Sequence, residues 1–88
     1  MCSLVELDVS ALAPPEPLVN ITTALAKLAN QQVLKVLHRR EPFPLYEQLN
    51  AAGWHYHTIK FSNDSYAIYI FRPQVQTAAM ALIAQDQP

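Results

Sequence analysis

Apolar residues recur with the spacing of helices in some segments of the chain and with the spacing of strands in others. Leu18, Ile21, Leu25 and Leu28 follow one another at intervals of three and four, which is typical of a helix with one buried face. The prolines just before Leu18 fit the first turn of that helix, where proline is tolerated. Short runs rich in β-branched and aromatic residues predict strands. These strands cover residues 3–8, 32–38, 54–61 and 66–72.

Two further helices complete the pattern. Leu45 to Gly53 predicts a short helix, because glycine readily adopts the left-handed conformation that ends helices. Residues 39–44 are predicted to be a loop, since their two prolines cannot donate hydrogen bonds to a strand ladder. Residues 73–85 predict a terminal helix, with apolar side chains at i, i+4, i+7 and i+8.

The order of these elements predicts an α/β fold. A strand, a helix and a second parallel strand are joined by a right-handed crossover, which places both main helices on one face of the sheet. The last two strands should form an antiparallel hairpin across residues 62–65. We expect a two-layer β-α-β-α-β-β sandwich with a mixed sheet, two helices on one face and a C-terminal helix. The expected division is 1–72 for the sandwich and 73–88 for the helical extension.

Composition narrows the classes of partner. The 88 residues carry a net charge of -1, and the six Lys and Arg are scattered apart from Arg39 and Arg40, which argues against nucleic acid. Cys2 is the single cysteine, so no internal disulfide or CxxC site can form, and a reducing compartment is expected. Acidic residues interrupt the first 30 positions, and no apolar run approaches the roughly 20 residues of a membrane span. A cytoplasmic protein with no membrane partner and no cofactor is expected.

Two segments resemble a known family. Residues 7–18 read Leu-Asp-Val-Ser-Ala-Leu-Ala-Pro-Pro-Glu-Pro-Leu, which is similar to the opening signature of TusA-like (SirA-like) sulfur carriers, Leu-Asp-x-x-Gly-Leu-x-Cys-Pro-x-Pro. Residues 38–46, followed by Gly53 and Trp54, resemble the loop His-Asp-Arg-x-Pro-x-x-Leu-Tyr of an uncharacterised bacterial branch. The resemblance covers residues 4–72 and implies the same fold. Relatives occur beside or fused to iron-binding and nitrogen-oxide-respiration proteins, which implies redox or metal physiology.

The resemblance fails at the residue on which the family's chemistry depends. Pro14 stands where TusA-like carriers hold the cysteine that carries persulfide sulfur, and Ala11 replaces the family's usual glycine. A thiolate near a helix N-terminus is activated by its lowered pKa, and proline has no such group. The resemblance therefore implies a non-catalytic binding module rather than an enzyme. The alternative is a sulfur carrier or sulfurtransferase-like protein that uses Cys2, which has no evident activating neighbour.

The ends of the two parallel strands supply the first candidate site, because open α/β sheets tend to bind ligands there. The start of the predicted helix, at residues 14–18, is a poor phosphate site, since its prolines lack N–H groups and it carries an acidic side chain. The polar groups could form a small-ligand pocket or dock a protein partner; alternatively, Arg40 pairs with Asp8 or Glu41 and His38 closes a loop hydrogen bond. The candidate residues are Asp8, Glu16, Pro17, His38, Arg40, Glu41 and Tyr46.

A histidine pair is the second candidate. His55 and His57 lie two apart on one predicted strand, so they share a face at a separation of about 7 Å. Two imidazoles are too few for a metal site, and a third ligand would come from His38 or a carboxylate. Zinc, copper, iron, nickel or haem would suit such a set. The alternative is a pair of ordinary surface histidines.

The third candidate is the sheet face opposite the two main helices. If alternate strand residues such as Trp54 and Tyr56 face those helices, a large apolar and aromatic surface lies on the other side, and monomers rarely leave such a surface bare. Either the terminal helix covers it, or another protein does, including a second copy of the chain. The residues expected at this interface are Val33, Leu37, Ile59, Tyr69 and Phe71.

Overall fold

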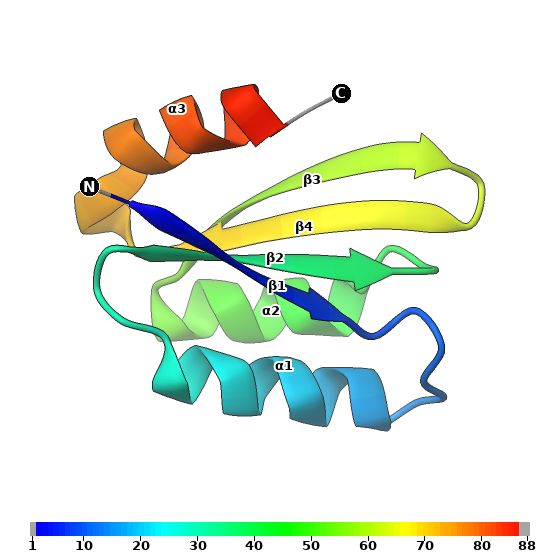
Figure 1. Ribbon diagram of the computed structural model, residues 1–88. Coiled ribbons are helices and arrows are strands. Elements are labelled where there is room, and N and C mark those ends of the chain that lie inside the picture. The colour runs from blue at the N-terminus through cyan, green and yellow to red at the C-terminus, as the bar shows by residue number, and fades with distance from the viewer. Residues whose placement is uncertain (1, 87–88) are drawn as a thin grey trace.

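A four-stranded mixed sheet forms the centre of the protein (Figure 1). The computed structural model describes residues 2–86. The strand order is β1-β2-β4-β3, with β1 parallel to β2 and the other two pairs antiparallel. The strands are β1 (Ser3–Asp8), β2 (Gln32–His38), β3 (His55–Ser62) and β4 (Ser65–Phe71). The helices are α1 (Glu16–Lys27), α2 (Phe43–Ala52), the 3-10 turn η1 (Pro73–Val75) and α3 (Gln76–Asp86).

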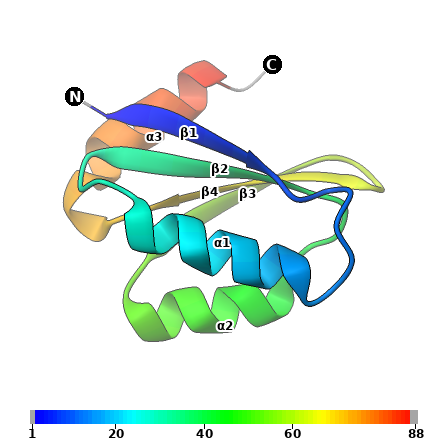
Figure 2. The ribbon, with the colours of Figure 1, turned by 60° about the horizontal axis from the view of Figure 1, so that its bottom comes forward.

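The helices lie on both faces of this sheet. Figures 1 and 2 show α1 and α2 side by side on one face and α3 on the other. The predicted α/β class, the β-α-β-α-β-β order and the parallel first pair are confirmed. The C-terminal helix adds a third layer to the two-layer core. The predicted boundary between residues 72 and 73 falls between β4 and η1 and stays a prediction, while residues 1, 87 and 88 lie outside the described part.

The start of α2 differs from the sequence prediction. Residues 39–44 were expected to be a loop, but the helix already begins at Phe43, with Pro44 inside its first turn. Proline is compatible with that position because the first backbone N–H groups of a helix have no partner within the helix. The predicted end at Gly53 is confirmed, with glycine in the left-handed region at φ 83°.

Strand alternation divides the core into two clusters. Residues such as Leu34, Val36, Ile68 and Ile70 face α1 and α2 and are fully buried with Ile21. The opposite face packs Val33, Ala67, Tyr69 and Phe71 against Ala79 and Ile83 of α3. The predicted facing of the strands is therefore the observed one.

The apolar sheet face predicted from the sequence lies largely beneath α3. Val33 and Tyr69 are fully buried and Phe71 is 2% exposed, while Leu37 and Ile59 remain half-buried. Of the two alternatives left open by the sequence, cover by the chain's own terminal helix is the one that this structure has. An interface with a partner or a second copy stays a prediction. No helix within residues 2–86 is both long enough and apolar enough to cross a bilayer.

Candidate ligand pocket

A cavity of about 370 Å³ opens where the first two strands end. It lies between the start of α1, the loop after β2 and the start of α2. Its walls are mainly apolar, formed by five prolines together with Leu18, Ile21 and Leu45, and its polar lining comes from His38, Arg40 and Glu41. This volume falls within the range of about 300–1,000 Å³ that ligand pockets occupy, and the mixture of apolar walls with few polar groups is typical of them. The prolines are Pro14, Pro15, Pro17, Pro42 and Pro44.

His38 is held in one orientation by its own loop. The backbone N–H of Arg40 donates to His38 Nδ1 at 3.1 Å, which is the loop hydrogen bond expected from the sequence. Burial lowers the pKa of His38 below its ordinary value, and the charges of Arg39 and Arg40 lower it further. The ring is therefore neutral near pH 7 and carries its proton on Nε2, which makes that atom a hydrogen-bond donor.

Arg40 and Glu41 do not form an ion pair with each other. Within residues 2–86 the Arg40 guanidinium forms no ion pair, so the alternative in which Arg40 pairs with Asp8 or Glu41 is wrong. Glu41 accepts a hydrogen bond from the Tyr46 hydroxyl at 3.2 Å, and that hydroxyl lies 2.6 Å from Thr58 Oγ1. Burial raises the pKa of Tyr46 to about 12, so the phenol keeps its proton. Tyr46 does not itself line the cavity, but its hydroxyl holds the Glu41 carboxylate, which does.

Asp8 and Glu16 do not line the cavity. Asp8 shares strand parity with Leu4, which packs toward α3, so it starts on the opposite face from the pocket. Its carboxylate accepts hydrogen bonds from the Ser10 backbone N–H at 2.9 Å and from the Ser10 hydroxyl at 2.6 Å, which lower its pKa. Glu16 is exposed at the start of α1, whereas Pro17 beside it does line the pocket.

The proline walls were missed by sequence reasoning. The prolines of residues 14–17 and 42–44 predicted loops and helix starts, and of these only Pro17 was proposed as a binding residue. A signal was present, because one proline group follows β1 and the other follows β2. Parallel neighbouring strands end at the same edge of a sheet, so the two groups had to meet.

Residues 6–72 match the model of a family described as an uncharacterized conserved protein, DUF2249. The chain belongs to this family. The match spans the strands from within β1 to the end of β4, and it contains every residue that lines the pocket. It stops before η1 and α3. No curated protein and no solved structure matches the chain.

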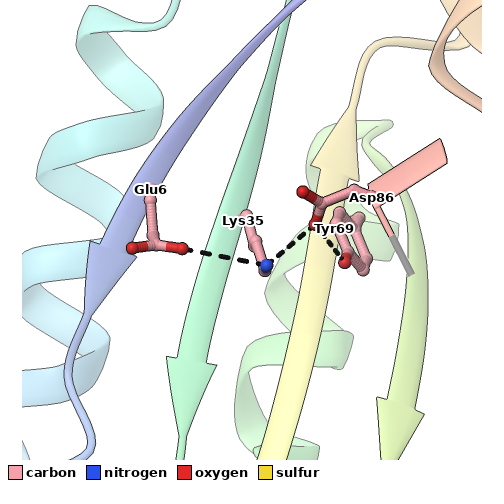
Figure 3. A network of polar contacts seen from close by, with 4 residues as sticks. All are labelled: Glu6, Lys35, Tyr69 and Asp86. Carbon is pink, nitrogen blue, oxygen red and sulfur yellow. Dashed lines mark hydrogen bonds and ion pairs between the residues drawn. The ribbon is translucent and has the colours of Figure 1, made fainter. Parts of the chain in front are cut away.

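This DUF2249 protein also carries a polar network that the sequence did not reveal (Figure 3). Lys35 Nζ lies 2.8 Å from Asp86 Oδ2 and 3.8 Å from Glu6 Oε1, and the Tyr69 hydroxyl donates to Asp86 Oδ2 at 2.7 Å. Hydrogen bonds from Lys35 and Tyr69 lower the pKa of Asp86. Asp86 is the last residue of α3, so the network joins the end of this helix to β2 and β4.

The three histidines of this DUF2249 protein do not gather. His38 faces the α1 and α2 side at the end of β2, whereas His57 has the strand parity of residues that face α3. His38 pairs with Tyr66 and His57 with Tyr69, so the two also occupy different levels of the sheet. His38 is therefore not the third ligand considered from the sequence. Within residues 2–86 no three His, Cys, Asp or Glu side chains lie close enough to hold a metal.

Cys2 of this DUF2249 protein and the pocket lie at opposite ends of β1 and on opposite faces of the sheet. It is half-buried just before β1, and it packs against the apolar cluster beneath α3. Pro14 lines the pocket beyond the other end of β1, on the side of α1 and α2. The thiol and the position of Pro14 are thus separated by the length of a strand and by the sheet itself.

Proposed function

We propose that this DUF2249 protein is a TusA-like, non-catalytic binding module that uses the proline-walled pocket. The observation that carries this proposal is the cavity of about 370 Å³ at the carboxyl ends of β1 and β2. Open α/β sheets favour ligands at that edge, because loops from neighbouring strands converge there. The resemblance to TusA-like proteins supports the same location, since their reactive residue occupies the position of Pro14.

The residues around Pro14 support binding rather than sulfur transfer. Proline supplies no thiolate to accept sulfur, and Cys2 packs on the opposite face of the sheet. No other cysteine exists in the sequence. By the resemblance, the pocket corresponds to the carrier site of TusA-like proteins, and Pro14 there lacks the sulfur atom on which the carrier reaction depends.

The lining indicates the chemistry of the ligand. Proline, leucine and isoleucine surfaces favour an apolar body, while His38 Nε2–H and the Arg40 guanidinium can donate hydrogen bonds to an anionic head. The prolines at the start of α1 lack the backbone donors that usually hold phosphate. We therefore propose a carboxylate on an apolar body, either as a small organic acid or as a group presented by a protein partner. The family resemblance favours a role in redox or metal physiology.

An NMR titration with phenylacetate and with uncharged 2-phenylethanol tests the proposal. Phenylacetate should produce saturable amide shifts at residues 14–21 and 38–45, and the alcohol should bind more weakly. Arg40→Gln should weaken phenylacetate roughly tenfold, because a hydrogen bond to a charged group contributes about 1.5–3 kcal/mol. Arg39→Gln is the matched control, since the neighbouring Arg39 does not line the cavity.

The outcomes separate the pocket from its chemistry. If phenylacetate gives saturable shifts at the pocket but Arg39→Gln and Arg40→Gln reduce its affinity equally, Arg40 is not the partner of the carboxylate. Shifts scattered over the surface, or none with either compound at millimolar concentration, would contradict the pocket as the binding site.

A further inference from the structure

A second cavity opens at the free edge of the sheet, along the edge strand β3. It measures about 440 Å³, and it is lined from the side of α3 by residues that include His55, His57 and Met80, and from the side of α2 by Asn50, Trp54 and Tyr56. His55 and His57 point to the face that α3 covers, and α3 begins at the same end of the sheet as β3 (Figure 1). We propose that His55, His57 and Met80 form a copper(I) site, with Met80 as the third ligand.

His55 is oriented as a metal ligand by a contact with the helix. Its Nδ1 lies 2.7 Å from Gln76 Oε1, and an amide oxygen can only accept a hydrogen bond. His55 therefore carries its proton on Nδ1 and leaves the Nε2 lone pair available. Such an outer hydrogen bond fixes the ring and its tautomer in metal sites generally. The edge contact between the His55 and Phe71 rings, with centroids 6.0 Å apart, restrains the same imidazole.

His57 and Met80 complete the set. His57 lies two residues along β3, about 7 Å from His55 on the same face. Within the described chain, no hydrogen bond or ion pair engages the His57 ring. Met80 is one helical turn beyond Gln76, so the thioether lies above the amide that orients His55. Met80 is 38% exposed, unlike the buried apolar residues of α3, Ala79 and Ile83.

The donor types select the metal. Two imidazoles with one thioether form a neutral and partly soft ligand set, which favours Cu(I). The cavity lining contains no thiolate, which is common at zinc sites, and no carboxylate, which is common at calcium and magnesium sites. A monovalent ion is also easier to hold without a compensating anionic ligand. The chemistry of these three side chains therefore points to copper(I) rather than to a divalent metal.

Anaerobic competition against the chelator bicinchoninate measures Cu(I) binding by the full chain. The experiment uses a Cys2→Ser background, because an accessible thiol binds Cu(I) by itself. We expect one Cu(I) per chain, bound more tightly than Zn(II), and a shift of the Met80 methyl signal in NMR on loading. Met80→Leu and His57→Gln should each weaken Cu(I) at least tenfold. Gln76→Leu should weaken it roughly tenfold through the orientation of His55.

Gln85→Leu is the matched control for Gln76→Leu, since it makes the same change at an exposed position of the same helix. It should leave Cu(I) affinity unchanged. Thermal unfolding of each apo variant separates loss of ligand from loss of fold, and Met80→Leu nearly conserves side-chain volume. Unchanged affinity in folded Met80→Leu and His57→Gln, or Zn(II) bound as tightly as Cu(I), would overturn the site. The pocket proposal would be untouched, since the two cavities share no lining residue.

Discussion

At the scale of single residues, Lys35 shows how a charge is accommodated on a central strand. Its side chain is 15% exposed, and an ammonium group removed from water is costly unless charged or polar partners replace the lost hydration. Asp86 supplies the close partner at 2.8 Å, Glu6 lies at 3.8 Å, and the Tyr69 ring lies 5.7 Å from the Lys35 nitrogen. Burial is the main reason that the pKa of Tyr69 is raised, so its hydroxyl stays protonated and donates to the Asp86 carboxylate.

Asp86→Asn should reduce the free energy of unfolding by about 1 kcal/mol near neutral pH, because the Asp86 side chain is 25% exposed and its ion pair is partly screened. Hydrogen bonds from Lys35 and Tyr69 hold the folded-state pKa of Asp86 below its ordinary value of 3.8. The stabilisation is therefore present above pH 3.8 and is lost as the pH falls through the folded-state pKa. Urea unfolding at several pH values measures it, and the difference between Asp86→Asn and the unchanged chain should shrink in acid.

Asp64→Asn is the control for that change, since Asp64 is an exposed carboxylate in the turn between β3 and β4. Asp64→Asn should lower the free energy of unfolding much less than Asp86→Asn does near neutral pH. An Asp86→Asn deficit that persists undiminished at pH 2.5 would show that the network does not act through the Asp86 charge.

Only the facing of Lys35 in this network could be predicted from the sequence. Strand alternation places Lys35 on the same face as Val33, whereas its pairing with Glu6 on one side and Tyr69 on the other follows from the register that the structure shows. The contact with Asp86 could not be predicted, because helical periodicity gives the buried side of α3 but not the angle at which the helix crosses the sheet. For the same reason the sequence could give two histidines on one face but not Met80 above them.

At the scale of elements, α3 determines how much of the second sheet face meets solvent. Ala79 and Ile83 are fully buried against Val33, Tyr69 and Phe71. Their spacing of four places them on one side of the helix. The segment itself was predicted well, since residues 73–85 were expected to be helical and η1 with α3 spans Pro73 to Asp86. Its position on the sheet was one of two alternatives, because periodicity does not say which apolar surface a helix covers.

Ile83→Ala should lower the free energy of unfolding by about 2–4 kcal/mol, as expected for truncation of a fully buried isoleucine. Gln85→Ala, at an exposed position two residues away, should change it by less than about 0.5 kcal/mol. Chemical denaturation followed by circular dichroism gives both values. Equal and small effects would mean that α3 does not pack on the sheet in solution.

At the scale of the whole molecule, two cavities with no lining residue in common are places where ligands could bind. The proline-walled pocket lies on the face of α1 and α2, and the cavity lined by His55, His57 and Met80 lies at the free edge of β3. The fold class, strand order along the chain and strand facing followed from hydrophobic patterning. The place of the pocket was also predicted, at the ends of the two parallel strands and with Pro17, His38, Arg40 and Glu41 among its residues. Its proline walls were not predicted, because they come from two segments that meet only after β1 and β2 pair in parallel.

Sulfur transfer by the intact chain tests the central claim that this DUF2249 protein binds without carrying sulfur. The chain is incubated with a sulfane-sulfur donor, and the transfer of sulfur to an acceptor thiol is followed by intact mass and by product. We predict no transfer above the rate of the donor and acceptor alone, and the same rate for Cys2→Ser. Catalysed transfer that disappears in Cys2→Ser would contradict the account.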